Sequence, residues 1–286
     1  MERKRNWWIK DKKITINSII KPNLPKNLKE ISDNIPHPEG IVVDDKNNIF
    51  VSSASTGNIF IIEKGKVRVH TNTKGRPLGI AYSKKLNELY VSDASIKSIL
   101  SINIRTSYVE KISDTFDNNP LNGPSDLVLT DEGSIVFTDP IRNPFPNPCI
   151  SPTYILDNDR KINQLIPDLA FPSGIAYFDK KVFISETRAN RLIALSININ
   201  EEENNIEPEL FRRFAEPGNP DGLTIDDDGD IYQTLPGIGA IAVINKQGEM
   251  VEIYHMDNWK PSNIHFNEGT FYVTDRLGSR IFQFSK

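Results

Sequence analysis

Residues 122–140 have the sequence NGPSDLVLTDEGSIVFTDP, and this stretch decides the fold. A turn at Pro124 leads into a short apolar run, a polar turn of Asp, Glu and Gly follows, and a second apolar run ends at Thr138. Two runs of β-forming residues joined by a short polar turn predict a β-hairpin. Because nearly every position in both runs is apolar, we expect both strands to be largely buried.

The same arrangement occurs six times along the chain. Each copy starts with a proline, a variable residue and a small or polar residue, and the six prolines lie 39 to 48 residues apart. They are Pro38, Pro77, Pro124, Pro172, Pro220 and Pro261. In the first five copies, a third run of alternating polarity and a fourth, more polar run follow the hairpin. Four strands in a repeat of about 40–45 residues are typical of a propeller blade, so the sequence predicts six blades.

The sixth copy ends after its third strand, near Phe284. Residues 27–35, directly before the first proline turn, are expected to supply the missing fourth strand, because a closed ring leaves no open sheet edge. The predicted fold is therefore an all-β, six-bladed β-propeller closed by an N-terminal strand in the last blade. We expect residues 21–286 to form this single domain and residues 1–20 to be a basic tail that contains Trp7 and Trp8. Helices should be nearly absent.

Charge and composition exclude several classes of protein. Thirty-four Lys and Arg against 38 Asp and Glu give a formal net charge of −4, so no global basic field is available for nucleic acid. The single cysteine, Cys149, excludes an internal disulfide and a Cys-rich zinc module. No run approaches the roughly 18 apolar residues of a membrane span. Charged residues interrupt the N-terminal stretch, so we expect no secretory signal and a cytoplasmic location.

The second residue of each proline turn lies at the mouth of a predicted innermost strand, so six of them should surround the central channel. They are Glu39, Leu78, Ser125, Ser173, Asp221 and Ser262. Two carboxylates and three hydroxyls, with no Lys, Arg or His among them, favour a hard cation such as calcium or magnesium. The alternative is that Ser and Asp stand here because their side chains stabilise turns. The sequence alone leaves both interpretations open.

A long loop is expected to overhang this ring. Residues 139–152 contain five prolines and join the second and third strands of the third blade, on the same face as the proline turns. Long loops in compact domains are often functional. We therefore predict substrate contacts from Asp139, Arg142 and Phe145 in this loop, and from Asn263 and His265 after the sixth turn. The alternative for Asp139 is a carboxylate that merely ends a strand, as Asp93, Glu186 and Asp275 also do.

The order and spacing of these segments resemble one known family. Besides residues 38–40 and 122–140, the matching stretches are residues 172–195, 219–232 and 261–275. The chain resembles the senescence marker protein/gluconolactonase/regucalcin-like family of six-bladed propellers. The resemblance implies a divalent cation, often calcium, held by a Glu in the first turn, Asn residues in the third and fourth turns and an Asp in the fifth. Glu39 and Asp221 match that pattern, whereas Ser125 and Ser173 stand at the two Asn positions.

These observations predict a metal-dependent hydrolase that acts on a lactone or related ester of small size. The cation would polarise the carbonyl group, and Asp221 would activate water or attack directly. One alternative is a metal-independent enzyme on the same scaffold, similar to strictosidine synthase-like proteins, which the serines at both Asn positions favour. The other is a non-catalytic binding propeller, which Leu78 in the ring and the Trp pair favour.

Overall fold

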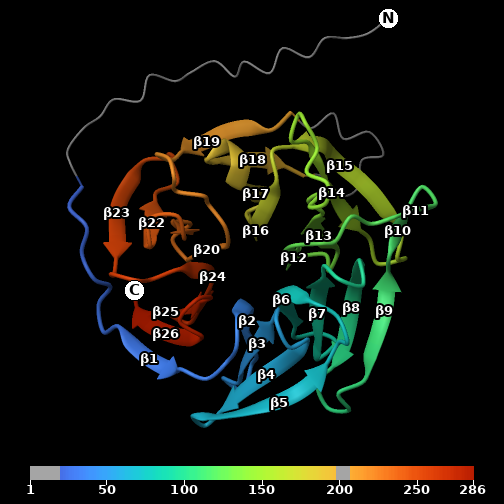
Figure 1. Ribbon diagram of the computed structural model, residues 1–286, viewed down its shortest axis with the longest axis horizontal. Coiled ribbons are helices and arrows are strands. Elements are labelled where there is room, and N and C mark those ends of the chain that lie inside the picture. Colours follow the sequence, from blue (N-terminus) through green and yellow to red (C-terminus); the bar gives the residue numbers. More distant parts are fainter. Residues whose placement is uncertain (1–19, 198–206) are drawn as a thin grey trace, which may run out of the picture.

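A computed structural model describes residues 20–197 and 207–286 of the chain. Six four-stranded antiparallel sheets surround a central axis, and the first strand of each sheet lies innermost (Figure 1). The predicted six-bladed propeller is confirmed. The basic tail predicted for residues 1–20 lies, except for Ile20, outside the described residues.

The strands of the first three blades follow in chain order. Blade one holds β2 (Pro38–Val43), β3 (Ile49–Ser53), β4 (Asn58–Glu63) and β5 (Lys66–Asn72). Blade two holds β6 (Pro77–Ser83), β7 (Glu88–Asp93), β8 (Ser98–Asn103) and β9 (Val109–Ser113). A small hairpin of β10 (Thr115–Phe116) and β11 (Asn119–Pro120) precedes blade three, which holds β12 (Leu127–Leu129), β13 (Ile135–Thr138), β14 (Ser151–Leu156) and β15 (Ile162–Leu169).

The other three blades complete the ring. Blade four holds β16 (Pro172–Phe178), β17 (Lys181–Glu186), β18 (Arg191–Ser196) and β19 (Glu209–Arg213), with a 3-10 turn, η1 (Thr187–Ala189), between β17 and β18. Blade five holds β20 (Leu223–Ile225), β21 (Ile231–Leu235), β22 (Ala240–Ile244) and β23 (Met250–His255). Blade six holds β24 (Pro261–Asn267), β25 (Thr270–Asp275), β26 (Arg280–Ser285) and β1 (Lys29–Ser32).

The N-terminal strand closes the ring as predicted. β1 pairs with β26 in antiparallel register, with Lys29 opposite Gln283 and Glu30 opposite Phe282. The last blade thus takes strands from both ends of the described chain, and the sheet edge of β26 is covered. None of the described residues forms a helix long and apolar enough to span a membrane.

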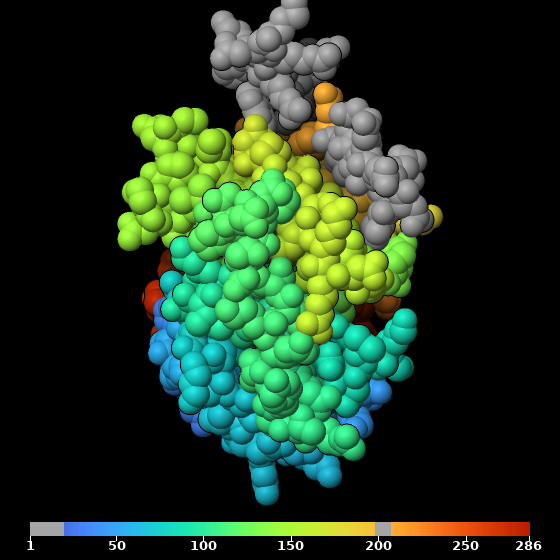
Figure 2. All heavy atoms as spheres, turned by 90° about the vertical axis from the view of Figure 1, so that its right-hand side faces the viewer, coloured from blue at the N-terminus to red at the C-terminus, as the bar shows by residue number. Residues whose placement is uncertain are grey.

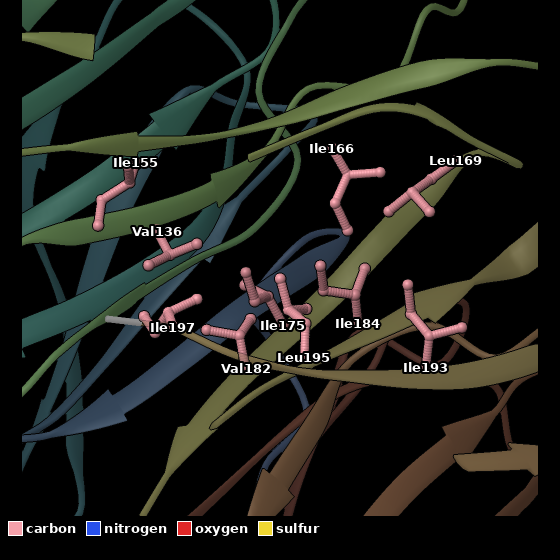
Figure 3. Close-up of a cluster of buried hydrophobic side chains, with 10 residues drawn as sticks. All are labelled: Val136, Ile155, Ile166, Leu169, Ile175, Val182, Ile184, Ile193, Leu195 and Ile197. Carbon is pink, nitrogen blue, oxygen red and sulfur yellow. The ribbon is translucent and has the colours of Figure 1, made fainter. Parts of the chain in front are cut away.

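The hydrophobic core is divided among the contacts between neighbouring blades. One cluster joins blades three and four, where Val136 and Ile155 pack with Ile175, Ile184 and other buried aliphatic side chains (Figure 3). Similar clusters join the other pairs of adjacent blades around the ring. Burial of these faces fixes each blade against the next, so the ends of the inner strands are held at fixed positions around the channel.

The proline-rich loop after β13 protrudes from one face of the propeller. In the edge-on view of Figure 2 it is the lime-green segment that stands out from one side. Its position between the second and third strands of blade three agrees with the sequence prediction. The innermost strands begin on this same face, so the loop lies beside the mouth of the channel.

Candidate functional site

A ring of hydrogen bonds holds the six turn residues around the channel. In five of the six blades, the second strand carries a polar side chain at or near its end that donates to a backbone carbonyl in the inner turn of the next blade. Ser92 Oγ donates to the carbonyl of Ser125 at 2.7 Å, and Thr274 Oγ1 donates to that of Glu39 at 2.7 Å. The carbonyls of Leu78, Ser173 and Ser262 are held in the same way by Ser52, Thr138 and Thr234. The carbonyl of Asp221 is held within its own blade by Gln233 Nε2, and Ser185 of blade four donates to Gln233 Oε1. The backbone of the site is therefore fixed by buried hydrogen bonds between blades.

These turns surround a cavity of about 580 Å³ at the channel mouth. All six ring residues predicted from the sequence line it. The volume lies in the range of small-molecule sites, about 300–1,000 Å³. The structure thus brings together the predicted ring, and it adds charged side chains that the ring alone did not indicate.

Arg276 is the most important of these additions. It follows β25, and its guanidinium lies between the two carboxylates of the ring: Nη2 donates to Glu39 Oε2 at 2.8 Å and to Asp221 Oδ2 at 2.7 Å. Its Nε also lies 2.8 Å from Glu39 Oε1. Although burial acts to lower it, the charges of Asp221 and Glu39 raise the pKa of Arg276. One fixed positive charge therefore bridges Glu39 and Asp221.

Glu39 is the more deeply buried of these two carboxylates, at 8% exposed. Burial raises its pKa to about 7; Arg276 acts to lower the value and Asp221 to raise it. The neighbouring His37 lies with Nδ1 3.8 Å from Glu39 Oε1. Burial and the charge of Arg276 lower the pKa of His37, which disfavours the protonated imidazole.

Asp221 is more accessible than Glu39 and faces the cavity. Its side chain is 19% exposed, and its Oδ1 accepts a hydrogen bond of 2.6 Å from Ser173 Oγ. Its two oxygens are thus oriented by a hydroxyl on one side and by Arg276 on the other. Ser125 lines the same cavity, and its backbone rather than its hydroxyl carries the hydrogen bonds described above.

The sequence prediction missed a third carboxylate, that of Asp126. It lines the cavity, is 7% exposed, and has a pKa raised to about 7 by burial. Its Oδ2 lies 3.4 Å from Asn263 Nδ2, which places the predicted Asn263 at the same site. A signal was present: Asp126 and Asn263 occupy the third position of their turns, where the other four turns have glycine.

Two of those glycines make room for the larger side chains. A Cβ on Gly79 would lie 2.3 Å from Asp126 Oδ1, and a Cβ on Gly222 would lie 2.4 Å from Asn263 Oδ1. Both distances are far below van der Waals contact. The alternation of glycine with Asp or Asn in neighbouring turns therefore brings Asp126 and Asn263 over the adjacent inner strands.

Asp139 does not line the cavity. It is fully buried, and its carboxylate accepts hydrogen bonds of 2.8 Å from the backbone N–H groups of Asn122 and Gly123. Asp93, Glu186 and Asp275 accept similar bonds from the backbone of Arg76, Ala170 and Lys260. These strand-end carboxylates brace the loops that lead into the inner strands. This geometry agrees with the structural interpretation of Asp139 that the sequence left open.

Of the other residues predicted to contact substrate, Arg142 and Phe145 lie in the proline-rich loop and His265 lies in β24. Arg142 lines the cavity, and its guanidinium lies 5.8 Å from the ring centroid of Phe171. Phe145 packs at 5.9 Å against Phe171 and lies under the guanidinium of Arg188, 4.8 Å away. The loop therefore contacts blade four across the rim. His265 is not among the cavity-lining residues, and burial lowers its pKa to about 4.

The divalent cation implied by the sequence does not fit this arrangement of side chains. Arg276 already contacts both carboxylates that would hold it, and Ser173 donates its hydroxyl hydrogen to one of them. Within residues 20–197 and 207–286, no group of three or more His, Cys, Asp and Glu side chains is placed to hold a metal ion. A cation could bind Glu39 and Asp221 only after Arg276 had withdrawn.

Fold and site together define a six-bladed β-propeller with a polar cavity at the mouth of its channel. A model of the SMP-30/gluconolactonase/LRE-like region matches residues 37–276, and the chain belongs to this family. This confirms the resemblance seen in the sequence.

Curated relatives and solved structures agree with this assignment. The lactonase drp35 of Staphylococcus aureus strain MW2 is 28% identical over 232 residues, which cover 77% of this chain and 69% of that protein. The lactonase drp35 of Staphylococcus haemolyticus is 26% identical over the same length. Among solved structures, the gluconolactonase XC5397 of Xanthomonas campestris has a TM-score of 0.78 at 16% identity, covering 93% of this chain and 98% of that one. The calcium-binding protein regucalcin of Agrobacterium tumefaciens has a TM-score of 0.79 at 15% identity, covering 93% and 95%.

Proposed function

We propose that this protein hydrolyses a lactone or related ester of small size in the cavity at the channel mouth. The observation that carries the proposal is the carboxylate of Asp221, which faces the cavity and is held by Ser173 on one side and Arg276 on the other. Family membership and the lactonase relatives support the reaction class. The cytoplasmic location expected from the sequence belongs to the same proposal.

The charges of the site suit the addition of water to a carbonyl group. Asp221 accepts a proton from water as the water oxygen forms a bond to the carbonyl carbon. Arg276 also lines the cavity, and its positive charge stabilises the oxygen on which negative charge develops. The bond from the carbonyl carbon to the ring oxygen then breaks, and Asp126 gives its proton to that oxygen. A pKa of about 7 leaves Asp126 partly protonated at neutral pH, as this role requires.

Hydrolysis of a panel of γ- and δ-lactones and aryl esters tests the proposal. We expect Asp221→Asn to lower kcat by about 10²–10⁴-fold, which is the usual contribution of general acid–base catalysis. Asp159→Asn changes an exposed carboxylate outside the cavity and serves as the matched control. Equal kcat values for Asp221→Asn and the unaltered protein would contradict the assignment of Asp221.

Calcium remains a prediction that the resemblance supplies. If Glu39, Ser125, Ser173 and Asp221 bound it, the ion would polarise the substrate carbonyl, and Arg276 would have to leave the position that it occupies here. Metal analysis of the purified protein and assays with a chelator separate the two forms of the reaction. Full activity with substoichiometric metal supports Arg276 as the cation, whereas loss of activity with the chelator and recovery with calcium supports the metal.

Arg276 also favours the metal-independent alternative on the same scaffold. An enzyme of that type would turn over no lactone in the panel but would retain the same cavity and the same internal cation. A non-catalytic binding propeller would likewise show no turnover. Condensation and ligand-binding assays on the purified protein distinguish these two outcomes.

A further inference from the structure

Three arginines on the rim of the cavity have no carboxylate partner among the described residues. They are Arg76, Arg142 and Arg188, and all three line the cavity with Arg276. Arg276 is committed to Glu39 and Asp221. The other three come from different blades: one precedes β6, one lies in the loop after β13, and one lies in η1.

The direct contacts of Arg142 and Arg188 are with neutral groups. Arg142 donates to the backbone carbonyls of Gly123 and Pro140, which are neutral acceptors. Arg188 lies over the ring of Phe145 at 4.8 Å, a contact that orients a guanidinium without neutralising it. No described residue forms an ion pair or hydrogen bond with the side chain of Arg76, which is exposed.

The positive charges of Arg76 and Arg142 repel each other. Burial lowers the pKa of Arg142 to about 10, and the charge of Arg76 acts in the same direction, whereas the charges of Asp139, Asp221 and Glu39 act to raise it. Grouping positive charges costs free energy, and none of the three arginines has a carboxylate in direct contact among the described residues to offset this cost. A bound anion would remove this cost, and guanidinium groups present paired N–H donors that match carboxylate and phosphate oxygens.

We propose that the substrate is an anion and that Arg76, Arg142 and Arg188 bind a carboxylate or phosphate group on it, away from the bond that is hydrolysed. This inference rests on the proposed function, because it assigns the substrate class of the same cavity. The carboxylates that act on the scissile bond line the cavity near the channel axis, and the arginines line its rim. The substrate is then held at two places, with its charged end under the proline-rich loop.

Matched pairs of lactones test the substrate class. The first pair is γ-butyrolactone and the same ring with a carboxylate on the γ carbon, and the second is glucono-δ-lactone and its 6-phosphate. We expect kcat/KM to be about tenfold or more higher for the charged member of at least one pair, since hydrogen bonds to charged groups are the strong ones. Which pair shows the preference identifies the carboxylate or the phosphate. Equal values within both pairs would overturn the proposal and leave the proposed hydrolysis standing.

Two variants assign the preference to the rim. Arg76→Gln and Arg188→Gln are expected to reduce the charged-to-neutral ratio of kcat/KM by about tenfold or more, mainly through KM. Arg105→Gln changes an exposed arginine outside the cavity and should keep the ratio. An unchanged ratio in both rim variants would overturn the assignment.

A binding measurement separates failure of this inference from failure of the proposed function. Calorimetric titration with tetrahydrofuran-2-carboxylate, its uncharged alcohol analogue and inorganic phosphate requires no catalysis. Binding of either anion that weakens in Arg76→Gln but not in Arg105→Gln supports the anion site even if no lactone is hydrolysed. Binding that is absent, or equal in all three proteins, counts against it whatever the activity.

Discussion

Replacement of Arg276 by glutamine should destabilise the protein, and more strongly at pH 8 than at pH 5. The substitution removes the only charged partner that the described residues offer to both Glu39 and Asp221 at less than 3 Å. Removal of one member of a buried ion pair costs about 3–5 kcal/mol, whereas exposed pairs contribute at most about 1 kcal/mol. Because the Arg276 side chain is 32% exposed, we expect a loss of about 2–3 kcal/mol at pH 8.

The pH dependence follows from the pKa of Glu39. Burial raises this value to about 7 from an ordinary value of 4.5, so the carboxyl contributes most to stability while it is protonated and contributes less as pH rises through 7. Loss of Arg276 removes an influence that lowers this pKa, so ionisation of Glu39 becomes still more costly. At pH 5 Glu39 is protonated in both proteins and only Asp221 loses its partner, so the difference should shrink to about 1 kcal/mol.

Urea unfolding of both proteins at pH 5 and pH 8 measures these differences. Arg280→Gln is the matched control, because Arg280 pairs with the buried Asp275 outside the cavity. It should destabilise without the same dependence on pH. Equal losses for Arg276→Gln at the two pH values would refute the reasoning from Glu39.

Calcium gives a second readout for the same variant. With Arg276 absent, Glu39 and Asp221 lose the cation that contacts both of them among the described residues, so calcium should raise the Tm of Arg276→Gln more than that of the unaltered protein. Stoichiometric calcium in the unaltered protein, removed by a chelator with loss of stability, would show that Arg276 does not serve as the site's cation.

If Asp126 is the general acid, kcat/KM of the unaltered protein should fall above about pH 7, where Asp126 loses its proton. Asp126→Asn should abolish this fall and lower kcat by about 10²–10⁴-fold, and a pH–rate profile measures both effects. Since the pKa of Asp126 is raised by burial, stability from this group is lost as pH rises through 7, so Asp126→Asn should be more stable than the unaltered protein at pH 8 in urea unfolding. Gly79→Ala should destabilise by about 1–3 kcal/mol, because its Cβ would lie 2.6 Å from the Cα of Asp126, and thermal unfolding checks this. Ser173→Ala should lower kcat by about tenfold, because it removes the 2.6 Å hydrogen bond that orients the Asp221 carboxylate; steady-state kinetics on the same lactone measure the change.

The blades could be predicted because each repeat carries its own hairpin pattern. Alternating and continuous apolar runs are local signals, and the proline turns set their spacing. The closing strand followed from one further constraint, since a sixth blade with three strands would leave an open edge. The same regularity placed the six turn residues around the channel, where the structure finds them.

The charges of the cavity could not be predicted from the turns alone. Arg276 follows the second strand of the last blade, and Arg76 precedes the inner strand of the second. Their side chains reach the cavity from outside the ring, so the spacing of the ring residues holds no information about them. Asp126 could have been predicted from the sequence, because a carboxylate replaces glycine there at a repeated position. Its burial could not, because it depends on the space left by Gly79 in the neighbouring blade.

Arg276 changes the interpretation of Glu39 and Asp221 as metal ligands. In the sequence, the carboxylates of Glu39 and Asp221 looked like oxygen ligands for a metal ion taken up from solution. In the structure the positive charge is part of the chain, and the serines at positions 125 and 173 are consistent with this, since an internal guanidinium needs fewer oxygen ligands than a metal ion. If the charge is internal, the site is fixed by folding rather than by metal concentration. Activity should then be insensitive to chelators but sensitive to every change that moves β25, which positions Arg276.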